Sequence, residues 1–176
     1  MNIIESERLS LRRLTIDDAE FILGLLNQPS FLQFIGDKGV RTLDEARNYI
    51  LQGPVSSYER YGFGLYLTSL KADGVPLGMC GLLQRENLND VDVGFAFLPQ
   101  FWGQGYALES VTAVLEYGQS VLGLARIVAI TSPDNYASIK VLEKSGLRFA
   151  QTMRLTEDAP EVKLFVLDFG AKEAAH

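Results

Sequence analysis

The chain has 176 residues, 47% of them hydrophobic, and a formal net charge of −6. This size and composition predict one globular domain over residues 1–176, and no apolar run approaches the roughly 18–20 residues of a membrane span. The opening MNIIESERLS lacks the features of a signal peptide, so we expect a cytoplasmic protein. The acidic balance argues against nucleic-acid binding, which needs a basic surface. It favours a cationic partner such as an amine.

The two rarest residue types exclude several kinds of catalytic site. Cys80 is the only cysteine, so an internal disulfide is impossible, and His176, the only histidine, is the last residue. Chain ends are usually frayed, which makes a Ser-His-Asp triad, a Cys-His pair or a metal site with His and Cys ligands unlikely to form. We therefore expect no metal. Proton transfer must use Asp, Glu, Tyr, Ser, Lys or water.

The first half of the chain is predicted to be a mixture of strands and helices. Apolar periodicity indicates, in order, a strand at 7–14, a helix at 17–27, a loop at 28–39, a helix at 42–51 and strands at 63–70 and 76–83. Thr15 can cap the first helix, and Thr42 with Glu45 forms a capping box for the second. We expect Phe31 and Phe34 to be exposed aromatics in the loop.

The second half continues with a strand at 92–98, a helix at 108–122, a strand at 126–131, a helix at 136–145 and a closing hairpin of strands at 149–155 and 162–169. The predicted order is therefore β-α-α-β-β-β-α-β-α-β-β. With no repeat and no linker, this order indicates one α+β domain.

The turn at 98–107 (LPQFWGQGYA) joins a buried strand to a helix and is the most informative segment. The first turn of a helix has backbone N–H groups without intrahelical partners, and the helix dipole adds positive charge there. Gly103 and Gly105 let the backbone approach a bulky anion closely. The turn therefore predicts a ligand with a pyrophosphate, although two glycines alone also fit a simple tight turn.

Two common phosphate-binding loops do not fit this turn. A P-loop needs Lys-Ser or Lys-Thr after its last glycine, where this chain has Tyr106 and Ala107. The dinucleotide fingerprint needs a small residue at the position of Leu108. It also needs an acidic residue about 20 positions further on, where this chain has Ala125 and Arg126.

The motif Gln100-x-x-Gly103-x-Gly105 instead resembles the acetyl-coenzyme-A loop of the GNAT N-acetyltransferase superfamily. A second block, NYASIKVLEKSGL at 135–147, resembles the Asn-x-x-Ser-x-x-Val-Leu-Glu-Lys-x-Gly-Phe block of the RimJ/RimL-like branch, with Leu147 in place of Phe. The opening at 7–19 resembles the start of that branch. The resemblance implies the GNAT fold, with a mixed, mostly antiparallel central sheet flanked by helices.

The resemblance also implies acetyl-CoA as cosubstrate and the residues that bind it. In the family, main-chain groups of the strand before the loop pair with the pantetheine arm, and loop amides hold the pyrophosphate. Asn135 corresponds to a side-chain contact to the coenzyme and is equally suited to cap the following helix. Trp102 either flanks the coenzyme or covers the core edge. The cofactor-binding residues implied are Phe95, Phe97, Leu98, Gln100, Trp102, Gly103, Gln104, Gly105, Tyr106, Ala107, Asn135 and Ser138.

The groups that transfer protons are implied by the same resemblance. Many members protonate the leaving thiolate with a tyrosine where this chain has Leu142, so the role passes to Ser138, with Tyr136 as a fallback donor. Glu157 or Asp92 corresponds to the general base. Each of these residues also has a purely structural interpretation, as a small helix residue or as a charge at a loop or strand end.

The acceptor is an amine whose identity the residues do not reveal. It is either a protein N-terminal α-amine or a small amine, with Phe31, Phe34 and Tyr49 expected in the wall of its pocket; they could equally be core aromatics. We expect a monomer or homodimer with no membrane or direct nucleic-acid partner. The alternatives are a non-catalytic CoA-binding sensor of the same fold and, more remotely, a nucleotide-binding protein.

Overall fold

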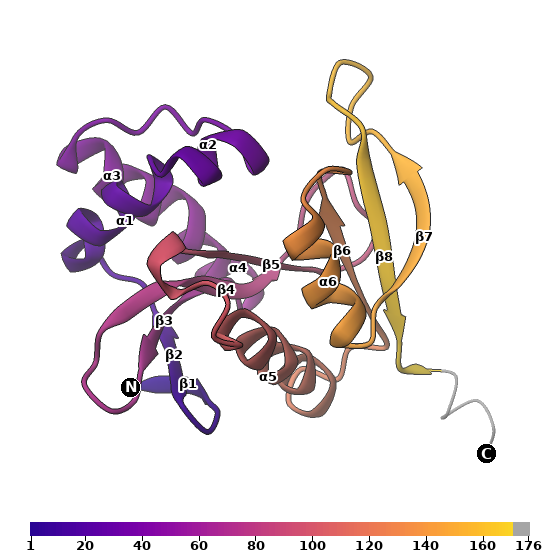
Figure 1. Cartoon of the computed structure of the whole chain (residues 1–176). Helices are drawn as coiled ribbons and strands as arrows, with labels where there is room; N and C mark the ends of the chain where they lie inside the picture. Colours follow the sequence, from indigo (N-terminus) through magenta and orange to yellow (C-terminus); the bar gives the residue numbers. More distant parts are fainter. Residues whose placement is uncertain (171–176) are drawn as a thin grey trace.

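The computed structural model describes residues 1–170 (Figure 1). Eight strands form one sheet in the order β1-β2-β3-β4-β5-β6-β8-β7. Neighbouring strands pair antiparallel except β5 and β6, which are parallel. The strands are β1 (Asn2–Glu5), β2 (Leu9–Arg13), β3 (Leu65–Leu70), β4 (Pro76–Leu83), β5 (Asp92–Phe97), β6 (Arg126–Thr131), β7 (Arg148–Met153) and β8 (Val162–Asp168).

Helices cover both faces of this sheet. In Figure 1, α1 and α3 lie on one side of the first five strands, while α5 lies on the other side. Among residues 1–170, no helix is long and apolar enough to cross a membrane. The α-helices are α1 (Ala19–Leu26), α2 (Pro29–Phe34), α3 (Leu43–Ile50), α4 (Ser56–Tyr61), α5 (Tyr106–Ser120) and α6 (Tyr136–Lys144), and the short helices are η1 (Ile16–Asp18), η2 (Leu51–Val55) and η3 (Pro99–Phe101).

The mixed, mostly antiparallel sheet confirms the expected fold class, but three elements were not predicted. Strand β1 has only four residues, and α2 begins at Pro29, which suits the first position of a helix, inside the segment expected to be a loop. The helix expected to end at Leu51 instead continues through the π-turn η2 into α4. Pro54 is accommodated within that turn, and the helix ends at Gly62, whose φ of 83° is left-handed.

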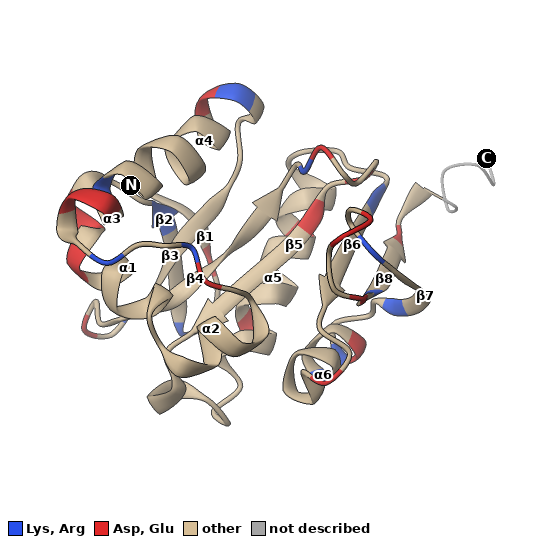
Figure 2. Cartoon of the chain, turned by 90° about the horizontal axis from the view of Figure 1, so that it is seen from above, with Lys and Arg blue, Asp and Glu red and all other residues tan. Residues whose placement is uncertain are grey.

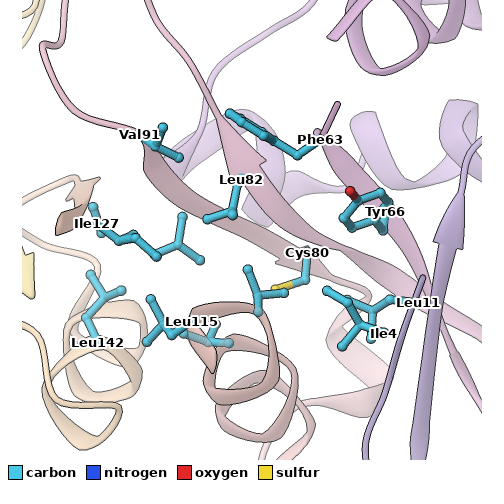
Figure 3. Close-up of a cluster of buried hydrophobic side chains, with 14 of the residues drawn as sticks. Ile4, Leu11, Phe63, Tyr66, Cys80, Leu82, Val91, Leu115, Ile127 and Leu142 are labelled. Carbon is cyan, nitrogen blue, oxygen red and sulfur yellow. The ribbon is translucent and has the colours of Figure 1, made fainter. Parts of the chain in front are cut away.

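Two buried clusters hold the helices to the sheet. Leu11, Cys80, Leu82 and Leu115 belong to the cluster between the sheet and α5, shown in Figure 3. The other cluster packs α1, α2 and α3 against the opposite face and includes Phe31, which is only 5% exposed. The expectation that Phe31 is exposed was therefore wrong, because α2 turns its ring into the core.

The sheet opens between β5 and β6. These two strands share a single bridge, between Asp92 and Val128, and the Val128 N–H donates to the Val91 carbonyl at 2.9 Å. Beyond that point they diverge, with α5 and α6 packed on one side of the opening (Figure 1). The diverging strands leave one edge of β5 without a partner strand.

Candidate active site

The free edge of β5 presents backbone hydrogen-bonding groups toward the opening. The Leu98 N–H donates to the Leu77 carbonyl at 2.9 Å, so the backbone of Leu98 points toward β4. Because alternate residues of an antiparallel strand point their backbone groups to opposite sides, those of Phe95 and Phe97 point away from β4. The Phe97 carbonyl accepts from the indole Nε1 of Trp102 at 2.9 Å. Phe95 is therefore the residue with both its N–H and its C=O available for an added strand.

The glycine turn ends at the N-terminus of α5. Gly103 and Gly105 have φ values of 76° and 84°, left-handed conformations that side chains rarely adopt. A Cβ at Gly103 would meet no atom within 4 Å, so the space beside this backbone is open. Gln100, Trp102 and Gln104 of the same turn are exposed. An open, glycine-lined backbone at a helix N-terminus can accept a phosphate group.

Arg8 links this turn to the first turn of α5. Its Nε donates to the Glu109 carboxylate at 2.7 Å, its Nη1 donates to the Gln104 carbonyl at 3.0 Å, and its guanidinium lies 4.4 Å from the centre of the Tyr106 ring. Glu109 also accepts from the Ser6 hydroxyl at 2.6 Å and from the Arg8 N–H at 2.8 Å. The first residues of the chain thus fix the first turn of α5.

The N-terminus of α6 faces the opening from the other half of the sheet. The Asn135 side chain accepts from the Ser138 N–H at 3.3 Å, which confirms the helix-capping interpretation of Asn135. Ser138 is half-buried, whereas the Tyr136 side chain is 74% exposed. Leu142, at the position expected for a tyrosine, is 1% exposed and belongs to the core. Ser138 is therefore the less exposed of the two hydroxyl donors.

Asp92 lies at the point where β5 and β6 separate, and its side chain is 1% exposed. The Arg85 Nε donates to both carboxylate oxygens, at 3.1 and 3.2 Å. Burial raises the pKa of Asp92 to about 6, although the positive charge of Arg85 and its hydrogen bond act in the opposite direction. A carboxylate with this pKa is half-ionised near pH 6 and largely ionised at pH 7, where it can accept a proton from a nearby group.

A cavity of about 240 Å³ lies on the α3 side of the sheet, and Tyr49 is part of its wall. Leu83, which also lines it, is the cross-strand neighbour of Asp92. Phe34 lies elsewhere, and its carbonyl accepts from the Ser132 hydroxyl at 3.0 Å, joining α2 to the chain after β6. The cavity is lined by Tyr49, Gln52, Gly53, Pro54, Ser56, Ser57, Arg60, Tyr61, Leu65, Leu83 and Gln84.

Glu157 lies in the exposed turn between β7 and β8. Within residues 1–170 its side chain forms no hydrogen bond or ion pair with Ser138 or with any other residue. The neighbouring Leu155 carbonyl accepts from the Asn87 side chain at 3.1 Å, which brings this turn against the β4–β5 connection that carries Arg85.

Two charged residues of the site escaped the sequence reasoning. Arg85 precedes Asp92 by seven residues in the β4–β5 connection, and only the folded structure reveals that they pair. Arg8 lies within the opening segment at 7–19, whose pattern indicates no role for it. Its partner Glu109 is an acidic residue in the first turn of a helix, a pattern that by itself indicates only dipole compensation.

A splayed sheet with a glycine turn leading into a helix at one end of the splay, and a buried carboxylate at the other, is the arrangement of an acyltransferase site. The model of the Acetyltransferase (GNAT) domain matches residues 8–148. The chain belongs to the GNAT family and is an acetyltransferase.

Relatives and solved structures agree with this assignment. YkkB of Bacillus subtilis (strain 168) is 31% identical over 85% of this chain and 87% of its own length. YoaA of the same organism, named as an N-acetyltransferase, is 29% identical over 86% of each chain. The structure of RimL, a ribosomal L7/L12 alpha-N-protein acetyltransferase in complex with coenzyme A, has a TM-score of 0.82 at 21% identity and covers 97% of this chain and 99% of that one. At that identity the likeness shows the fold.

Proposed function

We propose that this chain transfers the acetyl group of acetyl-CoA directly to a primary amine, with both substrates bound together. The observation that carries the proposal is the free edge of β5. It presents the N–H and C=O of Phe95 between an open glycine turn at one end and the buried carboxylate of Asp92 at the other.

The coenzyme side of the proposal follows from this geometry. The backbone of Phe95 would pair with the amide groups of the pantetheine arm as an added strand, and an N–H at the splay would polarise the thioester oxygen. The N–H groups between Trp102 and Ala107 would hold the pyrophosphate, supported by the dipole of α5. Acetyl-CoA supplies an activated acyl group with a thiolate as leaving group.

The remaining steps concern protons. As the amine nitrogen bonds to the carbonyl carbon and the C–S bond breaks, the amine must lose a proton and the thiolate must gain one. Asp92 would accept the amine proton, since its pKa of about 6 leaves it largely ionised at pH 7. Ser138, in the first turn of α6, would donate a hydrogen bond that stabilises the thiolate until water protonates it. Glu157 remains the alternative base.

The acceptor is an amine that enters from the α3 side of the sheet, where Tyr49 lines the cavity beside the strand neighbour of Asp92. It is either a protein N-terminus or a small amine. Phe34 and Phe31 do not line this cavity: the Phe34 carbonyl accepts from Ser132 after β6, and Phe31 is buried in the core. The products are an N-acetyl amide and free coenzyme A.

The test is thiol release from acetyl-CoA across a panel of small amines, amino acids and N-terminal peptides, combined with calorimetric titration of coenzyme A. Turnover of at least one amine, with binding of coenzyme A, supports the proposal. Tight coenzyme binding without turnover of any amine would instead favour a non-catalytic sensor, an alternative suggested by the buried Leu142 in the tyrosine position. Stabilisation against heat by ATP or NAD, but not by coenzyme A, would contradict both.

A further inference from the structure

We propose that the acceptor carries a carboxylate close to its amine, and that Arg85 binds this carboxylate with Lys38 as a second cation. This inference rests on the proposed function, because it places the amine at Asp92. It names a substrate class: an amino acid with a free carboxylate, or a peptide with an acidic residue next to its N-terminus.

Arg85 has an unused face. Only its Nε contacts Asp92, and within residues 1–170 its two Nη groups form no hydrogen bond. The side chain is 37% exposed, whereas Asp92 is 1% exposed. A guanidinium held rigidly through Nε presents its remaining N–H groups as a planar fork, the geometry that binds a carboxylate with two hydrogen bonds. Arg85 thus contacts the buried Asp92 through Nε, while its partly exposed Nη groups remain available to a ligand.

Lys38 provides a second positive charge near this fork. Although the Lys38 side chain reaches solvent, desolvation lowers the pKa of its ammonium, and the charge of Arg85 lowers it further. The carboxylate of the neighbouring Asp37 accepts hydrogen bonds from the Arg41 side chain at 2.6 Å and from the Gly39 N–H at 2.8 Å. Arg85 pairs with Asp92 only through Nε, and Lys38 has no ion pair within residues 1–170, so an added anion at the Nη groups would be attracted by the charges of both side chains. Figure 2 shows the α2–α3 connection that carries Lys38 passing over the sheet on the α1 side.

The acceptor cavity has the same electrostatic character. Its lining contains one charged residue, Arg60, and neither Asp nor Glu, although the chain as a whole carries a net charge of −6. A polycationic amine would find no counter-charge on this wall. The acidic composition alone favoured a cationic partner; the local charges favour an anionic group on the acceptor instead.

The two subsites lie close together, which limits the acceptor further. Because Nε of Arg85 is 3.1 Å from the Asp92 carboxylate, an amine at Asp92 and a carboxylate on the Nη fork must be separated by only a few bonds. An α-amino acid meets this requirement with its own carboxylate. A peptide meets it with an acidic side chain in its first residues.

The experiment compares acceptors that differ only in the carboxylate. One arm pairs free amino acids with their amides, and the other pairs peptides that have Glu or Gln as second residue. We measure kcat/KM by thiol release and, independently of turnover, acceptor affinity for the complex with coenzyme A by calorimetry. In at least one arm we expect the carboxylate form to be preferred about tenfold or more in both measurements, as for a charge-assisted bidentate contact. The arm that responds identifies the source of the carboxylate.

Variants locate the preference. Lys38→Gln leaves the Asp92 pair intact and should reduce the preference severalfold, and Arg85→Lys, which keeps the charge but loses the fork, should reduce it to about twofold or less. Arg47→Gln removes an exposed cation of α3 that pairs only with Asp44 and should change nothing. Equal rates and equal affinities within every pair overturn this inference while leaving the acetyltransferase proposal intact. A carboxylate preference in binding without any turnover supports the subsite and contradicts the proposed transfer.

Discussion

The Nε of Arg8 lies 2.7 Å from the Oε1 of Glu109, a residue 101 positions further along the chain. This ion pair joins the segment before β2 to the first turn of α5. Because Arg8 also donates to the Gln104 carbonyl, it fixes the orientation of the peptide group between Gln104 and Gly105. The position of the proposed pyrophosphate loop thus depends on the first residues of the chain.

Replacement of this carboxylate should weaken both the fold and the loop. Glu109→Gln loses charge-assisted contacts to Ser6 and Arg8, and we expect the free energy of unfolding to fall by about 1–3 kcal/mol, with weaker coenzyme A binding. Although burial acts to raise the pKa of Glu109, its hydrogen bonds from Ser6 and Arg8 lower it overall. Its stabilisation is therefore present above the ordinary glutamate pKa and is lost as the pH falls through the lowered value.

Urea unfolding at pH 7 and pH 4 and coenzyme titration measure these effects. Asp44→Asn is the matched control, because it breaks the exposed ion pair of Asp44 with Arg47 and should change stability by less than about 0.5 kcal/mol. Wild-type coenzyme affinity in Glu109→Gln would show that the ion pair of Arg8 with Glu109 is unnecessary for the loop.

Much of the fold was predictable because its signals are local. The strand at 92–98 and the helix after Gly105 follow from apolar spacing and the glycine turn, and the cap at Asn135 from one side chain. Helix α4 could not be predicted in this way. Pro54 normally ends a helix, and only the π-turn, with Pro54 buried, carries the chain past it.

The sequence indicates the candidate residues of the site one by one, but not which of them pair. The motif with Gly103 and Gly105 indicates the glycine turn directly, because the turn is formed by residues that are adjacent in the sequence. The pairing of Arg85 with Asp92 depends on the path of the β4–β5 connection, and the burial of Asp92 depends on packing across the sheet. Charges brought together by tertiary structure leave no local pattern.

The open space beside Gly103 predicts a selective loss of coenzyme binding in Gly103→Val. The new side chain would project into space where no protein atom lies within 4 Å, which is where a phosphate would approach. Gly123 is a matched control, since its φ of 69° is also left-handed and its surroundings are equally open. Both Val variants should lose about 1 kcal/mol or more to backbone strain. Calorimetry should show a reduction in coenzyme A affinity of at least tenfold for Gly103→Val alone; equal affinities in the two variants would exclude the loop from coenzyme binding.

The hydroxyl of Ser138 can be tested without disturbing the helix cap, because the Asn135 side chain accepts from the Ser138 backbone N–H. If the hydroxyl stabilises the leaving thiolate, Ser138→Ala should lower kcat by about a hundredfold, with coenzyme A affinity changed less than twofold. Ser120→Ala removes a hydroxyl that bonds only the Glu116 carbonyl at the far end of α5 and serves as control. An unchanged kcat in Ser138→Ala removes this hydroxyl from the mechanism and leaves Tyr136 or water as donor.

The raised pKa of Asp92 predicts the pH dependence of transfer. A base with a pKa of about 6 is protonated at pH 5 and ionised at pH 7, so kcat/KM should rise with pH with a midpoint near 6. Asp92→Asn should lose this rise, together with a factor of about 10²–10⁴ in rate. Glu157→Gln should retain both the rise and most of the rate. The opposite pattern, with loss in Glu157→Gln and not in Asp92→Asn, would assign the base to Glu157.

The same pKa predicts a change in stability of a definite sign. Because burial raises the pKa of Asp92 from its ordinary value of 3.8 to about 6, the folded protein binds a proton more tightly than the unfolded chain. The contribution of this group to the free energy of unfolding therefore falls as the pH rises from about 4 to about 6 and is constant above. Urea titrations across this range should show a larger fall in the free energy of unfolding with pH, or a shallower rise, for the parent than for any variant that keeps the other carboxylates but lacks Asp92. Asp92→Asn should remove this contribution, and Asp44→Asn should retain it; an Asp92→Asn profile parallel to that of the parent would mean that the carboxylate is not destabilised by burial.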